Sequence, residues 1–146
     1  MTNRFNTLIF SKDVSIKYSI TMNGENIKTR TKANAIKIGH LTLMLPYSYV
    51  DKQYILQIIW SSASVAANYS AASRGKSDKD FLNKLKICEE ECDETQFWLE
   101  LLAEFNPSYR EQIILLYKEC NELIAIFVSS IKTIRKKLEL QDKPSK

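Results

Sequence analysis

Glycine and proline are scarce in this sequence, with three of each in 146 residues. Their scarcity, together with 45% hydrophobic residues, argues against a turn-rich β architecture and favours long uninterrupted helices. No apolar run reaches the roughly 18 residues that a membrane span needs, and the N-terminus lacks the pattern of a signal peptide. The length suits a single domain with its own core. We therefore expect one all-α domain, located in the cytoplasm and away from membranes.

Histidine and cysteine are also too few for most catalytic centres. The single histidine is His40, and the odd number of cysteines suggests no disulfide framework. Cys88, Cys92 and Cys120 fall on apolar helical positions and are expected to be buried thiols. Cys88 and Cys92 could begin a zinc site, but the further Cys or His ligands are missing. We predict no bound metal and no cofactor.

Other reaction types lack their usual residues as well. A carboxylate-bridged metal centre in a helical bundle needs Glu-x-x-His motifs, and the sequence contains none. A nucleophilic Ser or Cys would need a positioned base, and the three glycines are scattered singly, so no loop can cradle phosphates. We therefore predict that the protein is not an enzyme and has no catalytic residues.

Apolar residues recur every three or four positions in four segments, which predicts four helices. The first covers residues 29 to 45 and ends before Pro46, whose ring cannot continue a helix. The second runs from Asp51, placed as its cap, to about residue 73. The third opens at Ser77 and the fourth, with Ser108 as a possible cap, extends to about residue 138. Short connections join them, so we predict an antiparallel up-down four-helix bundle over residues 27–140.

The same periodicity predicts which side chains the four helices bury. In chain order they are Ile36, Ile38, Leu41 and Leu45; Ile55, Ile58, Ile59, Ser62, Val65, Ala66 and Tyr69; Phe81, Leu85, Cys88, Cys92, Thr95, Leu99 and Leu102; and Ile113, Leu116, Tyr117, Cys120, Leu123, Ile124, Phe127, Ile131, Ile134 and Leu138. The second helix is unusually rich in Ser and Ala. Such small residues let a neighbouring helix approach closely, either in a crowded centre or between two copies of the chain.

The two ends of the chain differ from the bundle. Residues 14–22 alternate between apolar and polar side chains and Asn23-Gly24 forms a turn dipeptide, which predicts one strand. A single strand must pair with another copy, dock on the bundle or stay disordered. We assign residues 1–26 to an N-terminal extension, and whether residues 1–21 join the folded domain stays open. Residues 141–146 contain nothing apolar to bury and are predicted to be a disordered tail.

The net charge of +4 conceals a strong segregation along the chain. Residues 1–86 carry 13 Lys and Arg against 5 Asp and Glu, residues 87–122 carry 2 against 10, and residues 123–146 carry 6 against 2. A basic half and an acidic helix can form complementary faces for self-association, or a basic surface for a polyanion. Solvated helix faces with no partner would show the same pattern.

Basic residues gather in three places, and these are the candidate nucleic-acid contacts because Lys and Arg neutralise phosphates. The first helix carries Lys28, Arg30, Lys32 and Lys37; the second turn carries Arg74, Lys76, Lys79, Lys84 and Lys86; the end of the last helix carries Lys132, Arg135, Lys136 and Lys137. Antiparallel packing is expected to merge the second and third clusters. Tyr69 and Tyr109 are the only rings expected nearby, so base-specific reading is not indicated.

One stretch of the sequence resembles a known family. It comprises Ser61-Ser62-Ala63-Ser64-Val65-Ala66-Ala67-Asn68-Tyr69, then Arg74-Gly75-Lys76-Ser77 with Asp80-Phe81, and Trp98-Leu99-Glu100-Leu101-Leu102. These residues resemble the four-helix bundle proteins encoded in 23S rRNA intervening sequences, over roughly residues 27–138. Members of that family are similar to the accessory variability proteins of diversity-generating retroelements.

The resemblance implies a four-helix protomer, assembly into a homopentamer, and nucleic acid and a reverse transcriptase as partners. Our leading hypothesis is a homo-oligomeric bundle that binds RNA or DNA with little sequence specificity through Arg74, Lys76, Lys79, Lys84, Arg135 and Lys136. The competing hypothesis is a protein-interaction scaffold, in which the acidic third helix meets the basic helices of neighbouring copies and no nucleic acid is bound.

Overall fold

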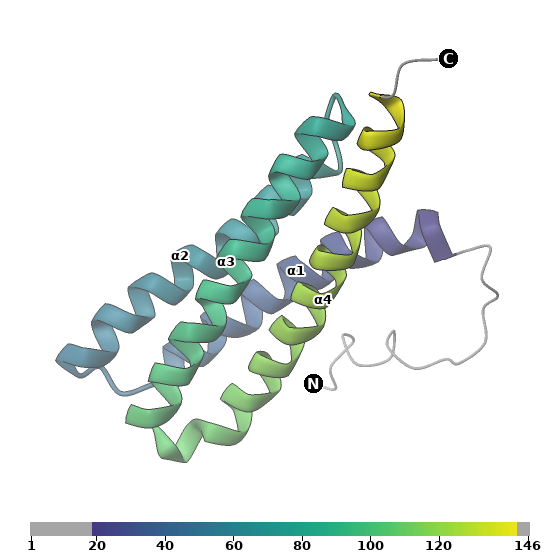
Figure 1. Ribbon diagram of the computed structural model, residues 1–146. Helices are drawn as coiled ribbons and strands as arrows, with labels where there is room; N and C mark the ends of the chain where they lie inside the picture. The colour runs from purple at the N-terminus through teal and green to yellow at the C-terminus, as the bar shows by residue number, and fades with distance from the viewer. Residues whose placement is uncertain (1–18, 143–146) are drawn as a thin grey trace.

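The computed structural model describes residues 19–142, and in this part of the chain the protein is a bundle of four long α-helices (Figure 1). They are α1 (Ser19–Met44), α2 (Tyr49–Ala72), α3 (Asp78–Phe105) and α4 (Arg110–Gln141). A single turn of 3₁₀ helix, η2 (Pro107–Tyr109), joins α3 to α4. Successive helices run in opposite directions, and residues 19–142 contain no strand. The predicted all-α, up-down four-helix bundle is confirmed.

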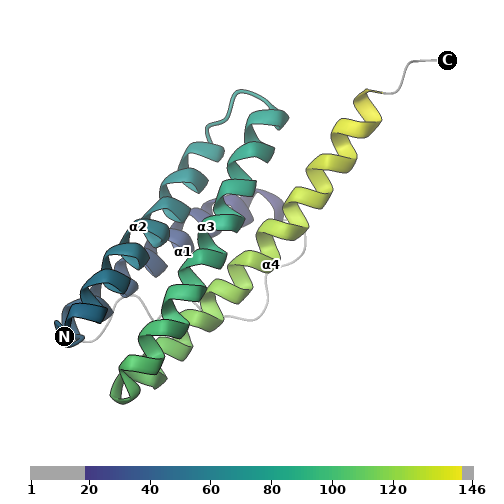
Figure 2. The same cartoon turned by 60° about the vertical axis from the view of Figure 1, so that its left-hand side comes forward.

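The helices pack in chain order around the bundle axis. Helix α2 lies between α1 and α3, and α4 closes the ring by contacting both α3 and α1. The backbones of the diagonal pairs, α1 with α3 and α2 with α4, do not approach each other closely within the described residues. Side chains still meet across one diagonal, where the rings of Tyr69 on α2 and Phe127 on α4 pack with their centroids 5.9 Å apart. Helix α1 is inclined to the other three, so its first turns diverge from α2 (Figures 1 and 2). This divergence leaves α1 less covered than α3.

The long apolar stripes of α3 and α4 form the centre of the core, as predicted. Leu85, Cys88 and Leu99 on α3 and Leu123 and Phe127 on α4 are completely buried. Some details of the predicted stripes are different. Leu82 rather than Phe81 is buried at the start of α3, and Gln96 joins the buried face. On α4 four of the predicted residues are only partly buried against the core: Tyr117, Ile124, Ile134 and Leu138. Burial of such stripes between neighbouring helices is the main force that holds a bundle together.

The predicted core positions on α1 and α2 are partly wrong. Ile36 is 51% exposed and Ile59 is 43% exposed. Ile38, Leu41 and Leu45 are buried as predicted, and the buried stripe of α1 also includes Ile27 and Thr31, which the prediction did not name. The inclination of α1 explains the difference, because its apolar residues at the α2 side do not reach the neighbouring helix.

The prediction for the beginning of α1 is also wrong. Helix α1 begins at Ser19 rather than at residue 29, so residues 19–22, assigned to the end of a strand, and the Asn23-Gly24 turn are helical. Extending an existing helix adds one hydrogen bond for each residue fixed, whereas an isolated strand gains no partner. The rest of the predicted strand, residues 14–18, lies outside the described residues. So do residues 143–146 of the predicted tail, while Gln141 still belongs to α4.

The helix caps are only partly those predicted. Ser77 caps α3 as expected, with its Oγ accepting a hydrogen bond from the Asp80 N–H at 3.1 Å. Ser48, not Asp51, caps α2: its Oγ accepts a hydrogen bond from the Asp51 N–H, and its hydroxyl donates a hydrogen bond to the Asp51 carboxylate. Ser108 lies within the η2 turn, and α4 has no side-chain cap. Asp51 is therefore a buried hydrogen-bond acceptor in the first turn of α2 and not the N-cap residue.

Candidate nucleic-acid interface

One end of the bundle gathers the basic residues that the sequence placed in two separate clusters. Arg74 and Lys76 lie in the turn between α2 and α3, Lys79 lies in the first turn of α3, and the last turns of α4 carry Arg135 and Lys136. The two segments meet, because Lys137 Nζ on α4 lies 2.7 Å from Asp78 Oδ2 at the start of α3. We call these five residues the basic end, and their predicted convergence is confirmed for the α3 and α4 segments.

The side chains of the basic end point into solvent. All five are exposed, and none of them forms an ion pair with another residue in the described part of the chain. Lys84, the sixth candidate, differs from them: it is half-buried in the seam between α2 and α3, and its Nζ donates to Asn68 Oδ1 at 3.3 Å. Lys84 therefore has less freedom to reach an external phosphate than the other five.

The cluster on α1 does not join the basic end as a unit. Arg30 donates to both carboxylate oxygens of Glu119 on α4, at 2.8 and 2.9 Å, and to Glu122 at 2.6 Å. The hydrogen bonds with Glu119 raise the pKa of Arg30 above its ordinary value. Arg30 is thus a structural link between α1 and α4. Lys28 and Lys32 instead line a groove between α1 and α2, and Lys37 lines a second groove against α4.

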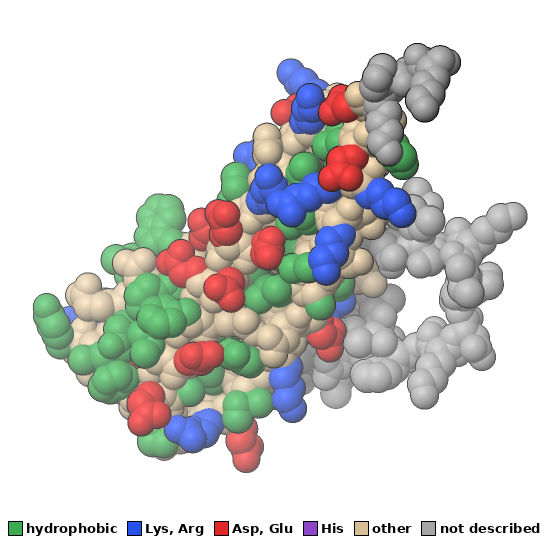
Figure 3. All heavy atoms as spheres, viewed as in Figure 1, with side chains coloured by type: hydrophobic (Ala, Val, Ile, Leu, Met, Phe, Trp, Pro, Cys, Tyr) green, Lys and Arg blue, Asp and Glu red, His purple; other side chains and the backbone are tan. Residues whose placement is uncertain are grey.

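On one face of the bundle an acidic segment of α3 lies next to the basic end. Lys and Arg gather where α3 begins and α4 ends, while most Asp and Glu on the same face lie farther along α3 (Figure 3). Glu89, Glu90, Glu91, Asp93 and Glu94 form this acidic segment. Burial, followed by the charge of Glu94, raises the pKa of Glu91. The surface therefore changes sign along the length of the bundle.

The opposite end of the bundle is apolar, a feature that the sequence interpretation missed. Leu43, Met44, Tyr47, Tyr49 and Phe105 are all at least half exposed at the connections α1–α2 and α3–α4. Hydrophobic side chains cover the start of α2 and the end of α3 in the space-filling view (Figure 3). Most exposed aromatic rings thus lie at this end. Tyr69 lies near the end of α2 as expected but is buried. Tyr109 belongs to η2 at the other end of the bundle, so the expectation that it lies near the basic residues is wrong.

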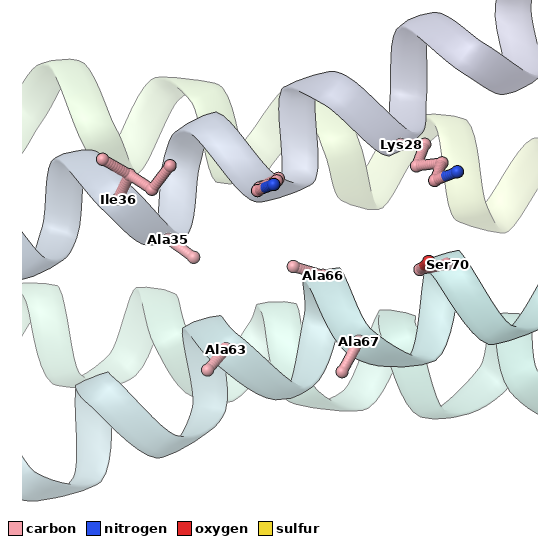
Figure 4. A pocket seen from close by; sticks show the side chains of 8 residues that line it. Lys28, Ala35, Ile36, Ala63, Ala66, Ala67 and Ser70 are labelled. Carbon is pink, nitrogen blue, oxygen red and sulfur yellow. The ribbon is translucent and has the colours of Figure 1, made fainter.

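The groove between α1 and α2 follows from the inclination of α1 and the small side chains of α2. It has a volume of about 540 Å³, and Ala35, Ala63, Ala66, Ala67 and Ser70 line it together with Ile36 and the two lysines. Ala35 and Ala66 point towards each other across the gap, while Lys28 and Ser70 lie at one end (Figure 4). The small residues of α2 therefore line an open surface groove as well as packing inside the bundle.

The thiols have the environment that the sequence predicted. Cys88, Cys92 and Cys120 are free and buried. Burial raises the pKa of the Cys88 thiol to about 12, and the hydrogen bond to Cys120 together with burial raises that of Cys92. Cys88 and Cys92 are therefore protonated and unreactive at neutral pH. The hydrogen bond with Cys92 lowers the pKa of Cys120 instead. Within residues 19–142 no three His, Cys, Asp or Glu side chains are grouped in a way that could hold a metal ion.

No helix among residues 19–142 combines the length and the apolar composition that a membrane span needs.

These features define the class of the protein: a small four-helix bundle with segregated surface charge along its length. The sequence profile of the 23S rRNA-intervening sequence protein family matches residues 26–129. The chain therefore belongs to the 23S rRNA-intervening sequence protein family, which confirms the resemblance noted from its motifs. The matched region begins within α1 and ends within α4.

A solved structure supports the same assignment. The chain is similar to a crystal structure of a protein of unknown function from the S23 ribosomal protein family of Bacteroides thetaiotaomicron, with 33% identity and a TM-score of 0.64. The similarity covers 73% of this chain and 98% of that chain. No curated protein sequence matches this chain significantly. The fold and the family of the chain are thus established.

Proposed function

We propose that this protein is a non-enzymatic, homo-oligomeric accessory protein that binds nucleic acid through its basic end. The observation that supports this function is the concentration of five exposed cations, none with an ion-pair partner among residues 19–142, on two segments that are more than 55 residues apart in sequence. Cations that lack protein partners are available to replace the counterions of a phosphate backbone.

The binding is expected to tolerate most sequences. Reading single-stranded bases needs aromatic rings for stacking, and the exposed rings lie at the apolar end rather than beside Arg74 or Arg135. Phosphate contacts fix position but carry no sequence information. RNA and DNA of mixed sequence should therefore bind with similar affinity at a given salt concentration.

Salt dependence tests this function quantitatively. If each copy contacts about five phosphates of a single strand, log K falls with log salt with a slope of about −3.5, so raising salt fourfold weakens binding roughly 100-fold. The measurement is the fluorescence anisotropy of a labelled single-stranded RNA titrated with protein at several NaCl concentrations. An affinity that is unchanged between low and high salt would refute the proposal.

Matched variants identify the surface. The triple variant Arg74→Ala, Lys76→Ala and Lys136→Ala removes three cations of the basic end and is expected to flatten the slope by about 2. The control, Lys37→Ala, Lys52→Ala and Lys118→Ala, removes three exposed cations elsewhere and should leave the slope unchanged. Equal effects of the two variants would mean that net charge, and not the basic end, governs binding.

A second candidate function is a protein-interaction scaffold that binds no nucleic acid. The apolar end supports it, because exposed aromatic residues are typical of surfaces that contact other proteins. The family resemblance adds a reverse transcriptase as the kind of partner expected. In this case added RNA leaves the electrophoretic mobility of the protein unchanged, while the oligomer mass depends on the charges of Glu90, Glu94 and Glu104.

A further inference from the structure

Helices α1 and α3 carry opposite net charges, and within one chain their described charged side chains do not pair with each other. Helix α1 carries four basic residues and one acidic residue, while α3 carries three basic and nine acidic residues. The two helices are diagonal in the bundle, and their backbones do not approach each other closely within the described residues. Their charges therefore face different sides of the molecule, and a second copy can bring the two surfaces together.

The basic surface is concave. Lys28 and Lys32 lie one helical turn apart on the α1 side of the α1/α2 groove, and Ala35 continues the same line three residues later. The opposite side of the groove presents Ala63 and Ala66 (Figure 4). The groove is bordered mainly by small residues, with Ile36 and the two lysines as its larger side chains, so it leaves room for a large side chain of a docking helix.

The acidic surface has the complementary shape and spacing. Glu90, Glu94 and Phe97 lie at positions i, i+4 and i+7 of α3, so they share one exposed face. Phe97 is 50% exposed. The line Lys28, Lys32, Ala35 has the same spacing, so each cation would meet one carboxylate along about 10 Å of parallel helix.

We propose that α3 of a second copy of this chain docks in the α1/α2 groove, parallel to α1. Glu90 and Glu94 of that copy pair with Lys28 and Lys32, and its Phe97 fills the space above Ala35 and Ala63. This proposal rests on the proposed self-association and names the two surfaces that form the contact. Because the two faces are different, each copy offers one groove and one α3, and repetition of the contact gives a closed ring or a filament.

Charge reversal tests the pairing. In sedimentation equilibrium, Lys28→Glu with Lys32→Glu and, separately, Glu90→Lys with Glu94→Lys should each weaken self-association roughly tenfold or more, since attraction becomes repulsion. The chain that carries all four substitutions restores the pairing with its charges exchanged and should recover the wild-type mass. Circular dichroism confirms that each variant is folded, and Lys37→Glu with Lys52→Glu is the control for two reversed charges outside the groove.

The possible failures can be told apart. If the wild-type chain stays monomeric at a protein concentration of about 100 μM, both the self-association and this interface are refuted. A wild-type oligomer whose mass neither reversal changes overturns this interface alone. If reversal of Lys28 and Lys32 weakens RNA binding but not self-association, the groove is occupied by nucleic acid and the proposal is wrong. The proposal is supported if each double charge reversal weakens self-association and the chain with all four substitutions regains the wild-type mass.

Discussion

A buried hydrogen bond between Asn106 and Asp51 is expected to hold the apolar end of the bundle together. Asn106 Nδ2 donates to Asp51 Oδ1 at 2.7 Å and to the Leu102 carbonyl at 3.0 Å. Asn106 and Asp51 are each only 3% exposed. The bond joins the start of α2 to the end of α3, two positions that are 55 residues apart in sequence.

The substitution Asn106→Ala leaves the buried Asp51 carboxylate without this donor. A hydrogen bond to a charged group contributes about 1.5–3 kcal/mol, and the second bond, to a neutral carbonyl, about 1 kcal/mol. The free energy of unfolding should therefore fall by about 2–4 kcal/mol, a large share of the total for a domain of this size. With a slope of about 2 kcal/mol per molar urea, the midpoint falls by about 1–2 M.

The assay is urea unfolding followed by circular dichroism at one fixed protein concentration, because self-association would otherwise change the midpoint. Asn83→Ala, at an exposed position of the same helix, is the control and should leave the midpoint nearly unchanged. In an Asp51→Ala background the cost of Asn106→Ala should become much smaller, since the two residues act together. A loss below about 0.5 kcal/mol for Asn106→Ala alone would refute the role of this bond.

Three further predictions concern other parts of the molecule. The three cysteines should not react with a thiol reagent such as Ellman's reagent at pH 8 in the folded state, because they are buried and burial raises the pKa of Cys88 to about 12. All three should react in urea. Rapid labelling of the native protein would contradict this prediction. Burial raises the folded-state pKa of Glu91, so the ionised carboxylate destabilises the folded state at pH values above that pKa and has no such effect below the pKa of the unfolded state. Glu91→Gln should therefore raise the urea midpoint at pH 7 but not at pH 4. An equal change at both pH values would exclude this cause. Phe97→Ala should weaken self-association measured by light scattering while Ile114→Ala, at a similarly exposed site on α4, should not; equal effects would remove Phe97 from the interface.

The longest periodic segments were the most predictable part of the fold. The alternation in steps of three and four from Leu85 to Leu102, and again from Ile113 to Ile131, identifies α3 and α4 and most of their buried residues. Each of these helices packs against two neighbours along its length, so a broad apolar stripe has to be buried. Periodicity in the sequence and burial in the structure therefore agree here.

Periodicity in the sequence was less successful for α1, both for its buried residues and for where it begins. Ile36 belongs to the apolar pattern but lies at the groove, because the inclination of a helix is set by packing with its neighbours and not by its own sequence. The alternation in residues 14–22 indicated a strand, although residues 19–22 extend a helix. A two-residue period over so short a segment is weak when no partner strand is present.

The candidate site was predictable in part. Charge segregation and antiparallel topology together predict that the second turn meets the end of α4, and the contact of Asp78 with Lys137 agrees. The sequence could not separate Arg30, engaged by Glu119 and Glu122, from cations without partners, because those pairs join residues about 90 positions apart. The apolar end was missed for a similar reason: exposure of Tyr47 or Phe105 depends on how two distant connections lie side by side.

Native mass spectrometry of the protein as purified, before and after a high-salt wash, tests most directly the claim that copies of this chain assemble and hold nucleic acid. The account predicts an oligomer of discrete size that carries additional nucleic-acid mass, and loss of that mass, with the oligomer retained, after the wash. A monomer with no associated nucleic acid at either salt concentration would contradict it.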